Sequence, residues 1–200
     1  ELLQLQDAVR EAGATDVTTV VPYMGYARQD DSFGDGEPVS ARAMARAIST
    51  GTDRVLLVNP HEATVADFFD VPAETVDAAG VLAAPLPADL DDPLFLAPDE
   101  GAIDAAATVR DAYGAGETDY FEKHRDRETG AVAVSPSDAP VADRDVVVVD
   151  DIIATGSTMS ESVAVLTDRG AARVLTACVH PVLAANAVTK LRAAGVDRIV

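Results

Sequence analysis

The chain has 200 residues, of which 48% are hydrophobic, and its 34 acidic and 15 basic residues give a formal net charge of −19. This composition excludes a disordered chain and argues against partners such as nucleic acid or an anionic membrane. No apolar run approaches the roughly 20 residues of a membrane-spanning helix. The single cysteine, Cys178, argues against a disulfide framework and favours a reducing cytoplasm.

Hydrophobic periodicity predicts alternating helices and strands in the first part of the chain. We expect a helix over residues 2–12, a strand over 17–21, a helix over 38–48, a strand over 55–58 and a short helix over 63–69. Because a helix feeds the first strand, the sheet is expected to contain an earlier strand that precedes the sequence as given.

Two segments after these strands carry groups suited to a nucleotide. Residues 22–31 have no helical or strand period and form a predicted loop, in which Arg28 and Gln29 offer donors for a phosphate or a base. A surface loop with a salt bridge is the alternative. His61 follows the second strand, beside Glu62. Taken alone, such a histidine is more often a hydrogen-bonding surface residue than a metal ligand.

Residues 70–93 are rich in Pro, Ala and Asp and have no clear periodicity, so we expect a domain boundary there. The predicted domains are 1–80 and 81–200. The second begins with a strand over 94–97, followed by Asp99, and a helix over 102–113.

A strand over 118–123 leads into a charged loop over 124–130 and a returning strand over 131–134. Lys123 and Arg125 form a local cationic centre in an otherwise acidic chain. Solvated hairpin charge is the alternative interpretation.

The most informative stretch is a run of four valines, 146–149, followed by Asp150 and Asp151. The valines predict a strand of a parallel sheet that is buried on both faces. Paired carboxylates after it can accept hydrogen bonds from a vicinal diol of ribose. A small polar loop and a helix over 160–169 follow, which favours phosphate binding by backbone N–H groups and hydroxyls. The loop residues are Ala154, Thr155, Gly156, Ser157 and Thr158.

An ordinary strand-to-helix turn with capping acids is the alternative, but capping requires neither paired acids nor so many hydroxyls. A strand over 173–179, a helix over 184–194 and a strand from 198 complete the chain. The fold class predicted is α/β, with parallel sheets flanked by helices.

The acidic pair and the polar loop resemble the phosphoribosyl pyrophosphate-binding loop of phosphoribosyltransferases and phosphoribosyl pyrophosphate synthetases. Residues 21–30, VPYMGYARQD, resemble a segment of the synthetases (ribose-phosphate pyrophosphokinases) that the transferases lack. Further segments that match this family are 59–61 with 68–70, 97–99 and 122–125. The resemblance implies two phosphoribosyltransferase-like sheets, an ATP-side domain first and a ribose 5-phosphate domain second.

The resemblance also implies a reaction in which ATP and ribose 5-phosphate give AMP and 5-phosphoribosyl 1-pyrophosphate. Arg28, Gln29 and His61 would bind ATP, and His61 with Asp99 would lie near Mg²⁺. Lys123 and Arg125 would be catalytic on a flexible loop. Asp150, Asp151 and residues 154–158 would bind ribose 5-phosphate.

This chain departs from the family pattern at several positions. It has Asn59-Pro60-His61 where the family often has Asp-Leu-His, and Ala97-Pro98-Asp99 where the family often has Ser-Pro-Asp. Ala154 replaces a commonly polar position. The family's first strands lie upstream of the sequence as given.

Two rival functions use some of the same residues. A phosphoribosyltransferase would pair the sugar-phosphate loop with a base, and a regulatory subunit of the synthetases would lack catalytic charge. The segment 21–30 argues against the first rival, and the presence of Lys123, Arg125, Asp150 and Asp151 argues against the second. The resemblance implies a cytoplasmic homo-oligomer that serves nucleotide biosynthesis, and the many acids with few lysines predict a halophilic source.

Overall fold

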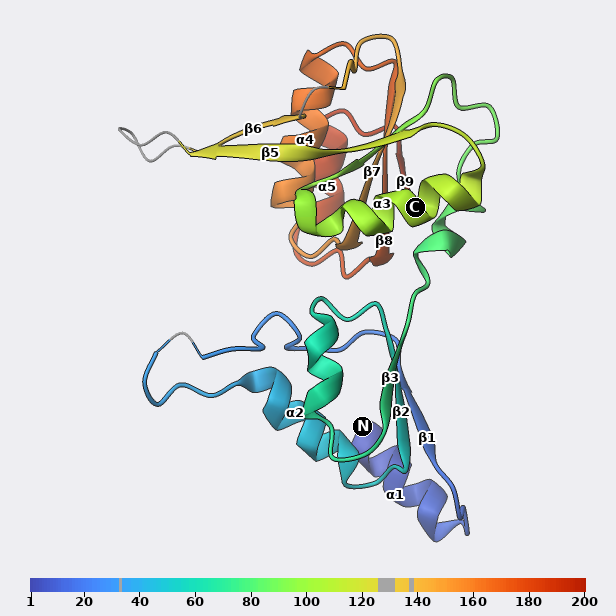
Figure 1. The fold of residues 1–200 in the computed structure, drawn as a ribbon, viewed down its shortest axis with the longest axis vertical. Coiled ribbons are helices and arrows are strands. Elements are labelled where there is room, and N and C mark those ends of the chain that lie inside the picture. The colour runs from blue at the N-terminus through green and yellow to red at the C-terminus, as the bar shows by residue number, and fades with distance from the viewer. Residues whose placement is uncertain (33, 126–131, 137–138) are drawn as a thin grey trace. The chain divides into compact units, whose positions relative to one another are not determined.

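The structure is a computed structural model that describes residues 1–32, 34–125, 132–136 and 139–200 (Figure 1). It separates into two compact units, Glu1–Asp77 and Ala78–Val200. Within the described part of the chain, no helix combines the length and apolar character needed to cross a membrane.

The first unit is a small three-stranded parallel sheet with helices. Its sheet order is β1-β2-β3, with Thr19 opposite Val55 and Leu57 opposite Thr75. The elements are α1 (Leu2–Glu11), β1 (Thr18–Val21), α2 (Ser40–Ser49), β2 (Arg54–Val58), the 3-10 helix η1 (Ala63–Phe68) and β3 (Ala73–Val76).

The core of the first unit lies on one face of this sheet. Val55 and Leu57 are fully buried and pack with Ala41 and Ala45 of α2 and with Val65 of η1. Small alanines on α2 allow the helix to approach the sheet closely, and they account for the apolar period that predicted the helix.

The second unit has a six-stranded sheet in the order β6-β5-β4-β7-β8-β9, parallel except for the β5–β6 pair. Its elements are η2 (Ala79–Ala83), β4 (Leu94–Ala97), η3 (Glu100–Ala102), α3 (Ile103–Tyr113), β5 (Glu117–Arg125), β6 (Val132–Pro136), β7 (Asp145–Ile152), α4 (Ser157–Asp168), β8 (Arg173–His180), α5 (Ala187–Ala193) and β9 (Arg198–Ile199). The predicted fold class, α/β with two parallel sheets flanked by helices, is confirmed.

The run of valines in β7 is buried on both faces, as predicted. Val146 and Val148 pack in one core with side chains of α4 and α5, whereas Val147 and Val149 pack in another with side chains of α3. Alternation of side chains along a strand produces this division. The central strand is therefore held between helices, and its carboxyl end is fixed in position.

Several element boundaries differ from the prediction. β7 continues through Asp150 and Asp151 to Ile152, because Asp150 and Ile152 still pair with β8. α4 begins at Ser157, three residues earlier than predicted. Strand β3 was not predicted, since this exposed edge strand contains few apolar residues.

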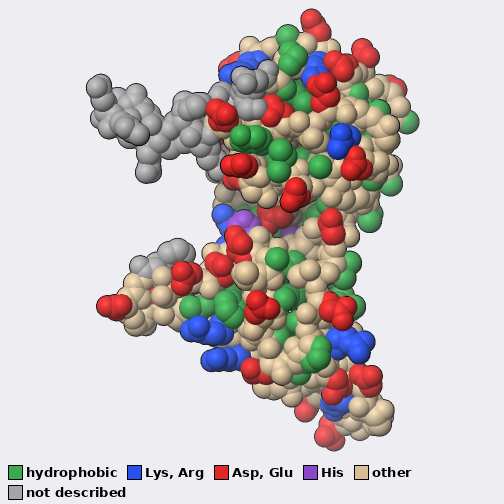
Figure 2. Space-filling model, viewed as in Figure 1, with side chains coloured by type: hydrophobic (Ala, Val, Ile, Leu, Met, Phe, Trp, Pro, Cys, Tyr) green, Lys and Arg blue, Asp and Glu red, His purple; other side chains and the backbone are tan. Residues whose placement is uncertain are grey.

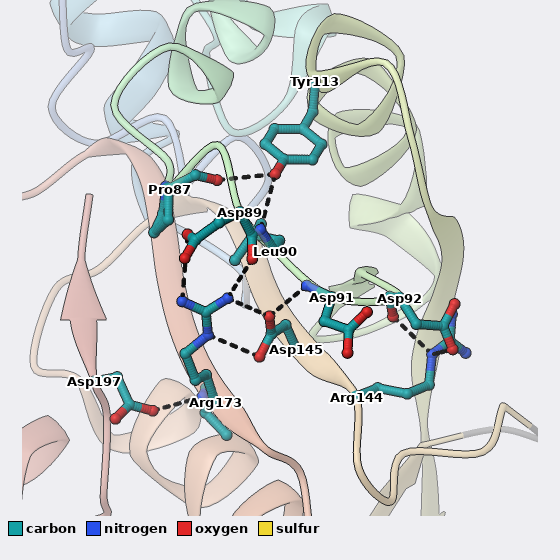
Figure 3. A network of polar contacts seen from close by, with 11 residues as sticks. Pro87, Asp89, Leu90, Asp91, Asp92, Tyr113, Arg144, Asp145, Arg173 and Asp197 are labelled. Atoms are coloured by element: carbon teal, nitrogen blue, oxygen red, sulfur yellow. Dashed lines mark hydrogen bonds and ion pairs between the residues drawn. The ribbon is translucent and has the colours of Figure 1, made fainter.

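A polar network joins strand starts in the second unit (Figure 3). The guanidinium of Arg173, at the start of β8, donates to both carboxylate oxygens of Asp145, at the start of β7. Asp145 also accepts a hydrogen bond from the Asp91 N–H at 2.6 Å, and Arg144 donates to the Asp92 carbonyl at 2.9 Å. Arg173, followed by the Asp91 N–H, holds the pKa of Asp145 below its ordinary value. Parallel strands all start at one end of a sheet and finish at the other. This network therefore lies at the opposite end of the strands from Asp150 and Asp151.

Candidate active site

The acidic pair lies at the carboxyl end of β7. Asp150 pairs in register with Cys178 of β8, and both aspartates are partly buried. Immediately after the strand, the Ile153 N–H donates to the His180 carbonyl at 3.2 Å, which joins the ends of β7 and β8. The two carboxylates thus lie within the strand, whereas the prediction placed them just after its end.

Negative charge is concentrated at this edge. Burial, the neighbouring carboxylate of Asp151 and the more distant Asp99 raise the pKa of Asp150 to about 8. The Asp151 N–H donates to an Asp150 carboxylate oxygen at 2.9 Å, which opposes the rise. Carboxylates whose charges disfavour one another are a suitable environment for a cation or for hydroxyl donors.

Asp99 reaches the same edge from a neighbouring strand. β4 lies beside β7 with Leu96 opposite Val148, so residues just beyond the two strands come close together. Asp99 follows β4 and precedes η3, in agreement with its electrostatic effect on Asp150. Among the described residues, however, no group of three or more His, Cys, Asp or Glu side chains is arranged to hold a metal ion.

Gly156 forms a sharp turn between β7 and α4. Its φ is +72°, and a Cβ at this position would lie 3.1 Å from both Cα and Cβ of Ala187 in α5. Only glycine adopts this backbone conformation easily, and only glycine permits so close an approach. The turn directs the chain into α4, which starts one residue later.

The amino end of α4 offers donors rather than acceptors. No side chain caps this helix, so the N–H groups of its first turn, beginning at Ser157, need partners from outside the helix. Thr155, Ser157 and Thr158 are exposed, and the hydroxyls of Thr155 and Ser157 lie 3.4 Å apart. Together with the helix dipole, these groups are suited to an anion such as a phosphate.

One residue beside this loop was not predicted as a site residue. The Lys190 ammonium, on α5, donates to the Ser157 hydroxyl at 2.8 Å. The available signal in the sequence was the rarity of lysine, because Lys123 and Lys190 are the only lysines of the chain. Sequence spacing could not show that α5 returns to the start of α4.

Lys123 and Arg125 lie on the backbone of a hairpin that extends from the sheet (Figure 1). Lys123 is opposite Val134 and Arg125 opposite Val132 in the β5–β6 pair. The strand therefore continues two residues beyond its predicted end, and the prediction that Arg125 lies in a loop is wrong. Most of the predicted charged loop, residues 126–130, lies outside the described residues.

The residues predicted to bind ATP belong to the first unit. Arg28 is exposed on the loop after β1, as is Tyr26, whose φ is +69°. The Gln29 side chain accepts from the Ser40 hydroxyl, and the Ala41 N–H donates to the Gln29 carbonyl at 3.1 Å. Gln29 therefore ties the loop to the start of α2, and its amide is partly engaged by the protein itself.

His61 is exposed and follows β2 by three residues. The preceding turn contains Asn59 with a φ of +36°, and its side-chain amide donates to the Asp77 carboxylate at 2.8 Å. Asparagine tolerates this backbone conformation better than most residues.

The structure brings together Asp99, Asp150, Asp151 and residues 154–158 at one edge of the second unit, with Lys190 beside them. This arrangement presents acceptors at the strand ends and donors at the start of α4. It is chemically suited to a molecule with hydroxyls at one end and a phosphate at the other.

Two family models match the chain. Residues 1–51 match the N-terminal domain of ribose phosphate pyrophosphokinase, and residues 83–199 match the phosphoribosyl transferase domain. These segments fall within the first and second structural units respectively.

Relatives and a solved structure extend the match to nearly the whole chain. The ribose-phosphate pyrophosphokinase of Halobacterium salinarum is 63% identical over 199 residues, covering 100% of this chain and 70% of that protein. The Methanosarcina mazei protein of the same name is 46% identical and is covered over 66% of its length. A crystal structure of phosphoribosylpyrophosphate synthetase from Mycobacterium smegmatis has a TM-score of 0.82 at 30% identity, covering 98% of this chain and 64% of that one. The chain thus spans about two thirds of the length of these proteins.

The two domain matches, in the order in which the chain carries them, distinguish it from a phosphoribosyltransferase that has the second domain alone. Identities of 63% and 46% over the full chain agree with this distinction. The chain therefore belongs to the ribose-phosphate pyrophosphokinase family, the enzyme class that its motifs predicted.

Proposed function

We propose that this chain binds ribose 5-phosphate at the carboxyl edge of the second unit and ATP through the first, and that it transfers the pyrophosphoryl group to the sugar. The products are AMP and 5-phosphoribosyl 1-pyrophosphate. The single observation that supports the sugar site best is that hydrogen-bond acceptors lie at the end of β7 and hydrogen-bond donors lie at the start of α4. Carboxylates lie near the end of β7, and an uncapped helix begins at Ser157, five residues after Ile152.

This arrangement of acceptors and donors gives the bound sugar one favoured orientation. The 5-phosphate lies against the first turn of α4 and the hydroxyls of Thr155, Ser157 and Thr158. The ribose diol donates to Asp150 and Asp151, which would repel a phosphate. The anomeric oxygen is then directed away from α4, where a second substrate can reach it.

Mg²⁺ is the cofactor that the family implies, and the residues present fit it. Asp99 and the pair of aspartates supply the oxygen ligands that this ion prefers. Burial, followed by the neighbouring Asp151 and then Asp99, raises the pKa of Asp150. One or two protein ligands suffice because Mg²⁺ keeps waters and binds substrate phosphates, where it neutralises charge. His61 is a further candidate ligand, on the evidence of its motif.

Lys123 and Arg125 are proposed to neutralise charge on the phosphates during transfer. Phosphoryl-type transfer depends on positioning and electrostatic stabilisation more than on a covalent nucleophile. Within the described residues, this part of β5 pairs with β6. We propose that the hairpin carrying both residues closes over a bound nucleotide.

Arg28, Gln29 and His61 are proposed to bind ATP. Tyr23 and Tyr26, which flank Gly25, are 43% and 60% exposed and can stack on a flat base. A homo-oligomer located in the cytoplasm is proposed from the family resemblance.

The test is direct detection of products by mass spectrometry. The full-length protein, incubated with ATP, Mg²⁺ and ribose 5-phosphate, should form AMP and 5-phosphoribosyl 1-pyrophosphate in equal amounts. Lys123→Ala should lower turnover by about 100-fold or more, while binding of ribose 5-phosphate stays within about twofold. Arg169→Ala, which removes an exposed arginine of the same unit, is the matched control.

Pyrophosphate release from 5-phosphoribosyl 1-pyrophosphate and a free base, without ATP, would instead support a phosphoribosyltransferase. Unchanged turnover of Lys123→Ala would refute the catalytic role of the hairpin but not the reaction.

A further inference from the structure

We propose that Lys190 is a phosphate-binding residue of the sugar site, and that it determines the affinity for the 5-phosphate of ribose 5-phosphate. The inference rests on the proposed function of the loop at residues 154–158. It adds to that loop a residue that lies more than 30 positions further along the chain.

Backbone contacts fix α5 against the loop. The Leu183 N–H donates to the Ile153 carbonyl and the Ala184 N–H to the Ala154 carbonyl, each at 2.9 Å. Ala187, the first residue of α5, is fully buried and lies against Gly156. The helix therefore cannot shift along the loop without breaking these contacts.

Lys190 lies one helical turn after Ala187 and faces the same way. It is partly buried, and its ammonium donates to the Ser157 hydroxyl at 2.8 Å. Leu191, the next residue, is fully buried in the core and holds this part of α5 in place. The position of the ammonium thus follows from the packing of the helix.

An ammonium at this position adds positive charge beside a helix start that already attracts anions. The amino end of a helix carries partial positive charge, and α4 begins at Ser157 without a side-chain cap. Among the ion pairs formed by the described residues, none involves Lys190. An ammonium has three donors, and the bond to Ser157 uses one of them.

Lysine is rare in this acidic chain, yet Lys190 lies beside the start of α4. With 34 acids available and only two lysines, the chain nevertheless directs one lysine at a helix start that already offers only donors. The donors at the start of α4 and the Lys190 ammonium converge, and such an arrangement is suited to a dianion, such as a sugar phosphate. The acidic pair at the end of β7 supplies no positive charge, so Lys190 also helps to determine which end of the sugar lies at α4.

The experiment compares Lys190→Met, which keeps the length of the side chain, with Arg192→Met in the full-length enzyme. Arg192 is exposed on the same helix, so its substitution changes the net charge equally without removing a contact to Ser157. We expect Lys190→Met to raise KM for ribose 5-phosphate by about 10-fold to 100-fold, with kcat within about threefold. Arg192→Met should change KM by less than about twofold, and Lys190→Arg should restore part of the loss.

Binding of ribose 5-phosphate, measured by calorimetry without ATP, should weaken by the same factor in Lys190→Met. Equal KM values and equal affinities for Lys190→Met and Arg192→Met would overturn the inference, as would a loss confined to kcat. These outcomes are read against an active wild-type enzyme. Failure of the wild type to form AMP and 5-phosphoribosyl 1-pyrophosphate would instead overturn the proposed function.

Discussion

At the scale of single residues, Asp150 combines a proposed binding role with a cost to stability. Its carboxylate is partly buried beside Asp151, and Asp99 adds to the negative potential. Such strain is common at functional sites, where a bound ligand relieves it. Here the ligands would be hydroxyl donors of ribose and the charge of Mg²⁺.

Substituting Asp150 should therefore change how stability depends on pH. The folded-state pKa is raised from 3.8 to about 8, so the folded chain holds a proton that the unfolded chain releases. This contribution to stability is fully present below the unfolded pKa and is lost as pH rises from about 4 to about 8. Asp150→Asn stays neutral, so its free energy of unfolding should match that of the wild type near pH 4 and exceed it increasingly as pH rises, by several kcal/mol at pH 8.

Urea unfolding at several pH values and fixed salt concentration measures this difference. Asp168→Asn is the control, because Asp168 is exposed at the end of α4 and its substitution removes a carboxyl of the same unit away from the acidic pair. A pH-independent difference for Asp150→Asn would show that its carboxyl is ionised in the folded protein throughout.

At the scale of elements, the proposed sugar site depends on how closely α5 approaches the turn before α4. Gly156 has no side chain to separate them, and Ala187 occupies the space where a Cβ would lie. The same glycine sets the direction of α4 and the position of Lys190. Gly156 thus couples the loop, α4 and α5.

Gly156→Ala should therefore affect both stability and binding. A left-handed conformation costs an L-residue about 1–2 kcal/mol, and the contact at 3.1 Å adds displacement of α5. Gly170→Ala is the control, since Gly170 has a φ of +82° but the nearest atom to its Cβ would be 3.9 Å away. We expect both variants to lose stability, and only Gly156→Ala to raise KM for ribose 5-phosphate by about 10-fold or more.

Thermal unfolding and steady-state kinetics distinguish the two effects. Equal KM values for the two variants would show that the loop tolerates displacement of α5.

Periodicity and glycine positions predicted most elements, because strands and helices of a parallel α/β fold have strong local signals. The valines of β7 and the helix of residues 103–113 are examples. α1 shows the limit of this reasoning. Leu3 and Leu5 are 46% and 62% exposed, whereas Gln6 is buried and donates to the Thr19 hydroxyl at 2.8 Å. Which face of a helix is buried depends on partners that are distant in the sequence.

The site shows the same limit. Asp150, Asp151 and the hydroxyls after them are consecutive in the chain, so their chemistry could be predicted together. Lys190 could not be added, because its approach to Ser157 depends on the packing of α5 on Gly156. The engagement of Gln29 by Ser40 was likewise invisible in the motif.

At the scale of the whole molecule, acidic side chains are scattered over the visible surface of each unit, with fewer basic ones (Figure 2). A net charge of −19 makes the folded chain repel itself in dilute buffer. Salt shortens the distance over which surface charges repel one another, to about 10 Å at 0.1 M and about 3 Å at 1 M. Stability should therefore increase strongly with salt, which is the behaviour that the halophile-like composition predicts.

Cys178 provides a probe for this prediction. It is the single cysteine, 2% exposed, and burial with the nearby Asp150 and Asp151 raises its pKa to about 12, so the native thiol should be inert. Labelling with iodoacetamide, which is uncharged and so unaffected by the charge of the protein, reports opening of the second unit. We expect labelling to slow by about 10-fold or more between dilute buffer and about 2 M KCl. Free cysteine labelled in the same series corrects for salt effects on the reagent, and equally slow labelling of the protein in dilute buffer would contradict the prediction.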